Sequence, residues 1–431
     1  MIGASITIVT VSRAPAFHVG GVPATVGRMS ARAVRALATI VTVIIVATAA
    51  GGSESVEEFV RRHWRAPLEP QGPAPARFST IEASLRPEAC GTCHPAQYAD
   101  WRTSWHAAAT GPGIAGQLVE MLESDPASAL GCLGCHAPLA EQAPLALDDR
   151  RLVPNPAFDG ALHREGLPCA GCHVRAHQRF GPPRRDGSLA SAAPRETLPH
   201  GGVTRTPAFL SAAFCRGCHQ FGADGTSLNG KPLENTYREW EASRFARERV
   251  QCQDCHMPDR RHLWRGIHDA DMVRSGLSIE AAGSKTRVGI GDVVSLALTV
   301  KSVRVGHAFP TYVTPKVVLR AELIDAAGAV VEGSREERVI AREIALDLSR
   351  EIADTRLLPG QAATLRYRRR LPAARISARL SVVVYPDAFY TSFYEALLQQ
   401  GAGRGAAPIR EALEATRRSP FEVFRRELPL S

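Results

Sequence analysis

The chain has 431 residues, which excludes one compact core and predicts two or three domains. Its formal charge of +9 would suit a nucleic-acid-binding protein, but four of the arginines that contribute to this charge lie ahead of an N-terminal apolar run. All ten cysteines fall in one repeated pentapeptide, so no cysteine is left over.

The first fifty residues are typical of an export leader. Arg28, Arg32 and Arg35 precede the apolar run Ala36–Ala50, which ends in an Ala-Thr-Ala pattern suited to signal peptidase. We therefore expect residues 1–50 to be a signal peptide, with Met29 as an alternative start, or else an uncleaved N-terminal membrane anchor. The apolar run is short for a membrane span. In either form the rest of the chain is exported, and we expect it in the periplasm, membrane-anchored or at the cell surface.

Residues 51–85 are interpreted as a linker or wrapping arm. The segment Pro67–Phe78 is rich in proline and shows neither the helix period nor the strand period.

The sequence CxxCH then occurs five times, and we number these motifs first to fifth in chain order. They are Cys90–His94, Cys132–His136, Cys169–His173, Cys215–His219 and Cys252–His256. The composition predicts about 0.007 chance matches. Two thiols at this spacing reach the two vinyl groups of one porphyrin, and the histidine that follows binds the iron. Disulfides or zinc sites are the alternatives, but neither needs a histidine after every pair.

We therefore expect five covalently bound c-type haems. The thioether-forming residues are Cys90, Cys93, Cys132, Cys135, Cys169, Cys172, Cys215, Cys218, Cys252 and Cys255. The proximal iron ligands are His94, His136, His173, His219 and His256. Without the four leader arginines the charge is about +5, and ten propionates bring it to about −5 with ferrous irons or near 0 with ferric irons. The apparent basicity is balanced by the cofactor, so we expect no nucleic-acid partner.

The region 86–274 carries all five motifs and shows little sustained helix or strand periodicity. Short helical pieces such as Thr236–Glu248 are expected between the motifs. So few apolar residues would make a poor core, but porphyrins are large apolar bodies. We therefore expect a pentahaem domain of short helices and irregular structure whose core consists of the haems.

The region 275–395 contains no cysteine and alternates apolar and polar residues at period two. Strands are expected over residues 292–303, 316–331, 361–371 and 376–385, with glycine and proline turns between them. We predict an antiparallel β-sandwich of immunoglobulin-like type with about seven strands, followed by a helix over Phe389–Gln400. Residues 396–431 form a basic tail, helical or loose, so the fold class is α+β.

Each proximal histidine fills one of the two axial positions of an iron, so up to five further ligands are needed. Eight histidines remain outside the motifs and the leader, which is enough for bis-histidine ligation throughout. We favour five of them as distal ligands and consider the other three weaker candidates. The favoured five are His106, His200, His262, His268 and His307, and the other three are His63, His163 and His177.

Five segments carry a resemblance to a known family. They are CGTCHPAQYADWRTSWHAAA (Cys90–Ala109), TYREW (Thr236–Trp240), CHMP (Cys255–Pro258), GHAFPTY (Gly306–Tyr312) and DTRLLPG (Asp354–Gly360). These segments resemble multihaem c-type cytochromes related to the tetrahaem electron acceptor of hydroxylamine oxidoreductase. The chain is more closely similar to exported bacterial members with a C-terminal β-sandwich, over roughly Arg86–Tyr394. The resemblance implies that His106 is a distal ligand and that His262, His268 and His307 are candidates.

Two departures from the family are visible. The family commonly has glycine where Tyr312 stands, and no CxxCK motif of a lysine-ligated catalytic haem is present. Bis-histidine irons have no open position, so we predict an electron carrier that meets redox partner proteins transiently. The alternatives are an oxidoreductase with one open haem acting on a small nitrogen or sulfur oxyanion or on hydroxylamine, and a subunit of an extracellular haem filament. In the oxidoreductase, His177 with Arg175 or Arg179 would be acid and charge stabiliser.

Overall fold

The structure is a computed structural model that describes residues 54–191, 193–284 and 288–430. The predicted leader, residues 1–50, lies outside the described residues. The chain divides into Met1–Glu54 and Ser55–Ser431, and the description below concerns the second unit. No helix in the described ranges is long and apolar enough to cross a membrane.

The segment expected to be a linker begins instead with a well-packed helix. Helix α2 (Val56–His63) starts with a capping box, in which the Ser55 hydroxyl accepts from the Glu58 amide and the Glu58 carboxylate accepts from the Ser55 amide. Its Phe59 is buried in a cluster with Phe180. The helical period is confined to eight residues, which made it hard to detect in the sequence. Because Phe59 packs against Phe180, the arm belongs to the motif-bearing region.

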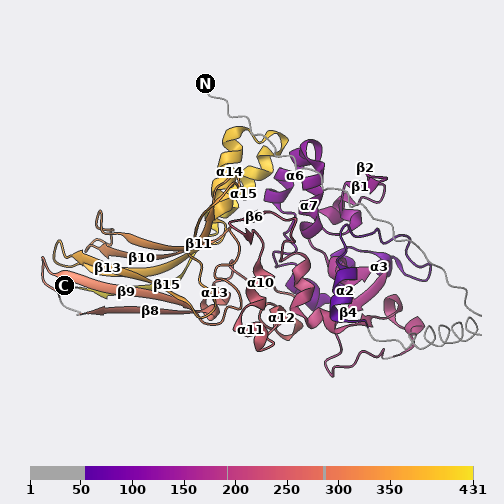
Figure 1. Ribbon diagram of the computed structural model, residues 1–431, viewed down its shortest axis with the longest axis horizontal. Coiled ribbons are helices and arrows are strands. Elements are labelled where there is room, and N and C mark those ends of the chain that lie inside the picture. Colours follow the sequence, from indigo (N-terminus) through magenta and orange to yellow (C-terminus); the bar gives the residue numbers. More distant parts are fainter. Residues whose placement is uncertain (1–53, 192, 285–287, 431) are drawn as a thin grey trace, which may run out of the picture. The chain divides into compact units, whose positions relative to one another are not determined.

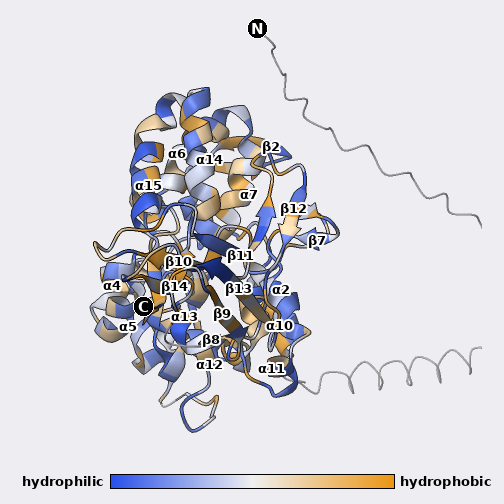
Figure 2. Ribbon diagram, turned by 90° about the vertical axis from the view of Figure 1, so that its left-hand side faces the viewer, coloured by the Kyte–Doolittle hydropathy of each residue, from blue (hydrophilic) through white to orange (hydrophobic). Residues whose placement is uncertain are grey.

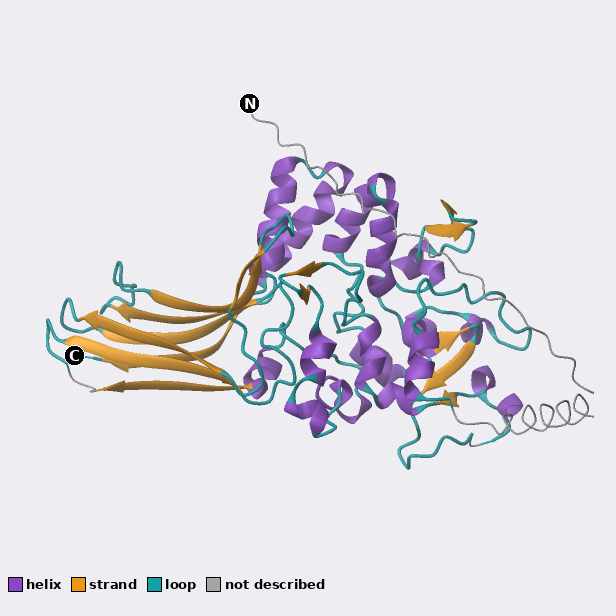
Figure 3. Cartoon of the chain, viewed as in Figure 1, coloured by secondary structure: helices purple, strands orange, loops and turns teal. Residues whose placement is uncertain are grey.

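Short helices dominate the motif-bearing region, as predicted (Figure 3). They are α3 (Thr80–Ala83), α4 (Pro87–Gly91), α5 (Pro95–Trp101), α6 (Pro112–Ser124), α7 (Pro126–His136), α8 (Gly160–His163), α9 (Cys169–His173), α10 (Thr236–Glu241), α11 (Arg244–Arg247), α12 (Cys252–His256) and α13 (Ala270–Gly276). Small sheets of two or three strands lie between them: β1 (Leu145–Asp148) with β2 (Arg151–Pro154), β3 (Val174–Arg175) with β4 (Gln178–Gly181) and β5 (Thr204–Arg205), and β6 (Ser227–Leu228) with β7 (Lys231–Pro232). The apolar side chains form several small clusters here rather than one core.

The following region consists of two antiparallel sheets that bury one apolar cluster between them. One sheet has the order β12-β11-β10-β14-β15, and the other has the order β13-β9-β8. The strands are β8 (Leu277–Ser284), β9 (Val293–Ser302), β10 (Lys316–Ile324), β11 (Glu336–Ile344), β12 (Glu351–Asp354), β13 (Ala362–Arg370), β14 (Ser377–Tyr385) and β15 (Phe421–Pro429). Burial alternates along β9 and β13, which explains their period-two pattern. The immunoglobulin-like topology stays a prediction.

The C-terminal tail differs from the expectation of a helical or loose extension beyond the sheets. Helix α15 (Ala406–Arg418) is followed by β15, which pairs with β14 from Ser377↔Pro429 onward and adds Val423 to the core. The sheet region therefore does not end at residue 395. The boundary was wrong because the consecutive charges Arg425, Arg426 and Glu427 hide the strand period on a solvent-facing edge.

Helix α14 (Ala388–Gln400) matches the helix predicted over Phe389–Gln400. Figure 1 shows α14 and α15 beside α6 and α7 of the motif-bearing region, and Figure 2 shows that these helices carry both hydrophobic and hydrophilic residues. The contact is close: the Cβ of any larger residue at Gly113, at the start of α6, would collide with the hydroxyl of Tyr394. The two parts of the unit thus share a helical interface.

Candidate functional site

Local helical turns position the cysteines of the motifs. The second, third and fifth motifs lie wholly in α7, α9 and α12, and the first begins in α4. In a helical turn, residues three apart share one face, so both thiols of a motif point toward the same ligand. This is the arrangement that two thioether bonds to one porphyrin require.

Backbone carbonyls hold three of the motif imidazoles by Nδ1. His136 Nδ1 bonds the Ala109 carbonyl at 2.6 Å, His173 Nδ1 that of Phe180 at 2.8 Å, and His256 Nδ1 that of Arg265 at 2.7 Å. A donating Nδ1–H leaves the lone pair on Nε2, the usual tautomer of a metal-binding histidine with an oriented ring.

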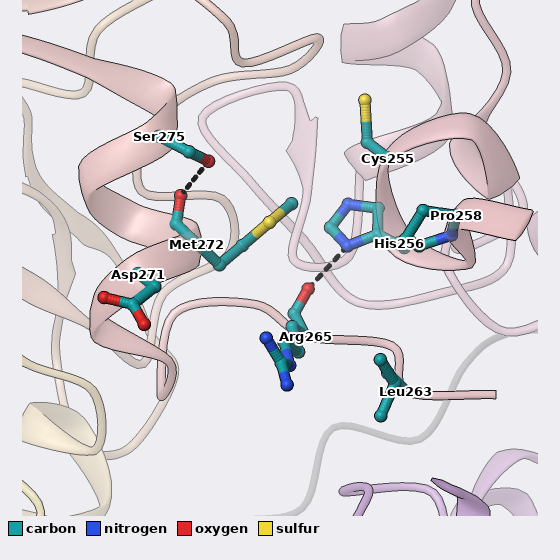
Figure 4. A pocket seen from close by; sticks show the side chains of 8 residues that line it. All are labelled: Cys255, His256, Pro258, Leu263, Arg265, Asp271, Met272 and Ser275. Carbon is teal, nitrogen blue, oxygen red and sulfur yellow. Dashed lines mark hydrogen bonds between the residues drawn. The ribbon is translucent and has the colours of Figure 1, made fainter. Parts of the chain in front are cut away.

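Figure 4 shows the fifth motif in detail. A cavity beside Cys255 and His256 is lined by Leu263, Arg265 and Met272 among others. The Met272 side chain points toward the imidazole, and the carbonyl of Arg265 bonds its Nδ1. Thiol, imidazole and apolar wall meet at this cavity, as a porphyrin edge requires.

Three motif histidines lie near a second histidine at a common distance. The ring centroids are 6.3 Å apart for His219 and His106, 6.2 Å for His173 and His262, and 6.3 Å for His256 and His307. Two imidazoles on opposite faces of one metal have centroids about 6.2 Å apart, since each bond is about 2.0 Å and each centroid lies roughly 1.1 Å behind its nitrogen. The residues present therefore fit a metal held between each pair.

Burial favours the neutral form of His106, His173 and His256, which is the form that binds a metal. It lowers the pKa of His106 to about 3 and the pKa values of His173 and His256 to about 4. His106 Nδ1 is buried without a hydrogen-bond partner. The Trp264 ring lies between two of the pairs, 4.6 Å from His106 and 5.2 Å from His262.

The first motif has His200 in its surroundings. Burial lowers the pKa of His200, and the nearby His94 contributes to that shift. His200 Nδ1 bonds the Gly202 carbonyl at 3.2 Å, which leaves Nε2 free. Its own amide donates to the Glu82 carboxylate at 2.6 Å, and this bond fixes the turn that carries it.

The second motif differs from the others. Burial lowers the pKa of His136, the Ala109 carbonyl opposes that shift, and no second imidazole of the described residues contributes. His268, a predicted distal ligand, bonds Asp387 through Nε2 at 2.9 Å and lies 4.1 Å from the Trp105 ring. The structure does not bring His268 to a motif histidine.

The three weaker candidates bond backbone carbonyls. His63 and His177 use Nε2, toward Cys172 at 2.8 Å and Gly72 at 2.9 Å, whereas His163 uses Nδ1, toward Gln142 at 2.6 Å. In His63 and His177 the bonded nitrogen is therefore Nε2, and Nδ1 is buried without a hydrogen-bond partner.

A buried carboxylate that the sequence did not single out orients the turn of His307. Glu239 of α10 accepts hydrogen bonds from the Ala308 amide at 3.2 Å and the Thr311 hydroxyl at 3.3 Å, and from Arg356 at 2.8 Å. His307 Nδ1 in turn bonds the Ala308 carbonyl at 2.9 Å. The TYREW, GHAFPTY and DTRLLPG segments thus meet at one carboxylate, which only their spatial contact reveals.

Thiols of different motifs also lie close together. The Cys90 thiol influences the pKa of Cys169, the Cys135 thiol that of Cys218, and the Cys215 thiol that of Cys252. Cys172 lies close enough to influence the thiols of the fourth motif. The fourth motif is therefore next to the second, third and fifth, and the first is next to the third.

Comparisons with known proteins agree with these observations. The family model described as cytochrome c554 and c-prime matches residues 89–153. The chain is similar in structure to a penta-heme cytochrome c552 from Thermochromatium tepidum, with a TM-score of 0.55 and 19% identity over 82% of this chain and 100% of that chain. That likeness concerns the fold. The chain also matches a CARDB domain of the PF1109 protein from Pyrococcus furiosus, with 16% identity over 25% of this chain and 67% of that chain. The TM-score of that match is 0.16, so it carries no argument.

No curated protein matches the chain. The family model covers the first two motifs only. Taken with the motif geometry, the family model and the fold support a multihaem c-type cytochrome.

Proposed function

We propose that this protein is an exported pentahaem cytochrome that carries electrons between transient redox partners. The observation that carries the proposal is the set of three imidazole pairs at 6.2 to 6.3 Å. Haem iron supplies one-electron chemistry, and a pair of imidazoles leaves no position for a substrate. His106, His262 and His307 would serve as the second ligands opposite His219, His173 and His256.

His94 with His200 is the proposed fourth pair. The free Nε2 of His200 and the proximity of the two imidazoles support it. Of the residues predicted as distal ligands, His268 is the one whose contacts do not support that role.

The proximity of thiols from different motifs supports a branched conduit. The first motif is next to the third, the third is next to the fourth, and the fourth is next to both the second and the fifth. Electrons entering near the first motif would reach the fourth and then divide between two ends. A carrier of this form can join one donor to two acceptors, or the reverse.

The experiment is to count and classify the irons of the purified holoprotein. We expect five haems per chain by pyridine haemochrome assay, and low-spin ferric EPR signals from at least four of them. Reduction of one haem in a flash experiment should be followed by redistribution among the others at a rate independent of protein concentration. A redistribution rate proportional to protein concentration would contradict internal conduction.

A second candidate function, an oxidoreductase with one open haem, is favoured by one observation. His136 is the motif histidine that no second imidazole approaches among the described residues. High-spin iron near one-fifth of the total would support this candidate, and fully low-spin iron would leave the carrier alone.

A further inference from the structure

The imidazole pairs differ in what accepts the proton on Nδ1. In the pair of His173 and His262, the Nδ1 atoms bond backbone carbonyls at 2.8 Å and 3.1 Å. In the pair of His256 and His307, the corresponding distances are 2.7 Å and 2.9 Å. Both rings of the third-motif pair and both rings of the fifth-motif pair therefore donate to the backbone.

The pair at the fourth motif lacks such carbonyl acceptors. His106 Nδ1 is buried and has no hydrogen-bond partner among the residues that the structure describes. Because this atom is buried, solvent does not take the place of the missing carbonyl. His219 bonds described residues through its backbone, to Cys215 and Tyr237, and not through its ring. The two rings are nevertheless 6.3 Å apart, as in the other pairs.

Trp264 takes the place of a carbonyl in orienting His106. Its ring lies 4.6 Å from the His106 ring at an interplanar angle of 77°, and 5.2 Å from the His262 ring at 89°. Edge-to-face contacts of this kind restrict the rotation of both imidazoles. The φ of Trp264 is +42°, which costs a bulky residue on the order of 1 kcal/mol, so packing holds the indole in this place.

The missing acceptor has an electronic consequence. A hydrogen bond from Nδ1–H shifts electron density onto the imidazole and makes it a more basic ligand. A more basic ligand stabilises the ferric state and lowers the reduction potential, and such hydrogen bonding is one of the means by which a protein sets that potential. His106 lacks this bond, so it stabilises the ferric state less than His262 and His307 do.

We infer that the fourth motif is the electron store of the conduit, with the highest reduction potential of the three paired sites, and that Trp264 is the positioning residue for its distal ligand His106. The inference rests on the proposed electron carrier. One electron from a donor protein converts ferric to ferrous iron at this site, and an acceptor protein of higher potential removes that electron again. The fourth motif is next to the second, third and fifth, so an electron reaches it from each of them.

The first test is a reductive titration of the native holoprotein at controlled potentials, followed by low-temperature EPR. The variants His106→Met, His262→Met and His307→Met identify the signals of the fourth, third and fifth motifs. We expect the fourth-motif signal to be lost first. Its ferrous-to-ferric ratio should be about tenfold above those of the other two sites at the same potential, which corresponds to 59 mV.

Pulsed EPR of the remote imidazole nitrogen gives an independent measurement. The quadrupole coupling of Nδ1 depends on whether its proton is hydrogen-bonded. We expect a nitrogen without a hydrogen bond in the fourth-motif signal, and hydrogen-bonded nitrogens in the signals of the third and fifth motifs.

Two substitutions test the role of Trp264. Trp264→Ala opens space for water beside His106, whose Nδ1–H then gains an acceptor, so the ferrous-to-ferric ratio should fall several-fold toward those of the other pairs. Trp264→Phe keeps an aromatic ring and should keep the native ratio and g values. Trp240→Ala is the matched control, because a Cβ at Gly306 would lie 3.4 Å from that indole, near His307. It should leave the fourth-motif signal unchanged.

Two outcomes overturn the inference: loss of the fourth-motif signal together with or after the other two, and equal Nδ1 couplings in all three signals. An unchanged ratio in Trp264→Ala, or an equal fall in Trp240→Ala, contradicts the role of Trp264. None of these results changes the spin states or the rate of internal redistribution, so the carrier proposal is tested separately.

A native EPR spectrum in His106→Met would refute the ligation itself, and the inference with it. Retention of all five haems in each variant, by pyridine haemochrome assay, shows that the substitutions have not disrupted the fold. The titration and the nitrogen coupling of the native protein decide the order of potentials even if Trp264→Ala does not fold.

Discussion

At the scale of single residues, the histidines divide by the nitrogen that meets the protein. His256, His262 and His307 bond a carbonyl through Nδ1, which leaves Nε2 for a metal. His177 and His268 are bonded through Nε2. The free nitrogen therefore separates these five residues, which position in the sequence does not, although His163 also bonds a carbonyl through Nδ1.

Replacing His307 by alanine should convert one iron from low-spin to high-spin. The His256 side would keep its imidazole and lose the partner 6.3 Å away. We expect the high-spin EPR signal to grow by about one-fifth of the total iron, and added imidazole to restore the low-spin state.

His177→Asn is the control for that experiment, because its ring bonds Gly72 rather than facing a motif histidine. It should leave the spin states unchanged even if it lowers stability. A high-spin signal in the His177 variant, or none in the His307 variant, would contradict the assignment.

At the scale of elements, the sheet region is fastened to the motif region through charged side chains. Arg356 and Glu239 are 6% and 8% exposed in their side chains, so their pair lies out of water. Arg356 also bonds Asp354 at 2.9 Å. Helix α10, the His307 turn and the segment after β12 thus behave as one hydrogen-bonded unit.

Replacing Glu239 by glutamine should loosen this unit. The substitution removes the charge that Arg356 faces and weakens the acceptor of the Ala308 amide. We expect a loss of about 2 kcal/mol in the free energy of unfolding, because Arg356 keeps Asp354 as a partner.

Denaturant titration monitored by the low-spin signal measures this effect. A double-mutant cycle with Arg356→Met separates the pair from the other bonds of Glu239. If the two substitutions are simply additive, the pair does not hold the turn.

At the scale of the whole molecule, the fourth motif is the junction of the neighbouring thiols. His106→Met should raise the potential of the iron bound at this junction, since a methionine ligand favours the ferrous state. Electrons would then be trapped there, and redistribution from the first motif to the second and fifth should slow roughly tenfold for each 59 mV.

The matched variant is His200→Met, which changes a terminal site. It should alter the potential at one end and leave exchange among the other motifs unaffected. Flash reduction with time-resolved optical spectra distinguishes the two. Equal slowing in both variants would contradict a branched order.

A second group of ion pairs joins the two regions and predicts sensitivity to acid. We call it the clamp, and it consists of Arg342, Lys231, Glu351 and Asp354. Arg342 has a fully buried side chain that bonds Glu351 at 2.9 Å and the Lys231 carbonyl at 2.9 Å, and the Lys231 ammonium bonds Glu351 and Asp354. Burial raises the pKa values of Glu351 and Asp354, but bonds from the cations outweigh it and hold both below their usual range.

Because the folded pKa values are lowered, the clamp is fully present above about pH 4.5 and is lost as the pH falls further. Denaturation midpoints at pH 7, 4 and 3 should fall more steeply for the native chain than for Glu351→Gln with Asp354→Asn. Glu337→Gln, which affects an exposed pair with Arg320, is the control and should show the native slope.

Sequence patterns predicted the motifs, β9, β14 and α14, because those depend on local spacing and period. They missed β11, whose Arg342 is buried in a polar network that no local rule reveals. They did not separate His268 from His307, because the carboxylate of Asp387 and the imidazole of His256 reach them from distant segments. Pairing of His106 with His219 likewise depends on tertiary contact.

The position of His307 in the β region has a consequence for maturation. During synthesis the chain emerges from its N-terminus, so all five motifs exist before residue 307 does. Attachment of haem at Cys252 and Cys255 can therefore precede arrival of the second axial ligand. With haem in place, that iron would be open to foreign ligands until the sheets fold and dock. Folding of the cysteine-free C-terminal region would thus be the step that closes the last haem.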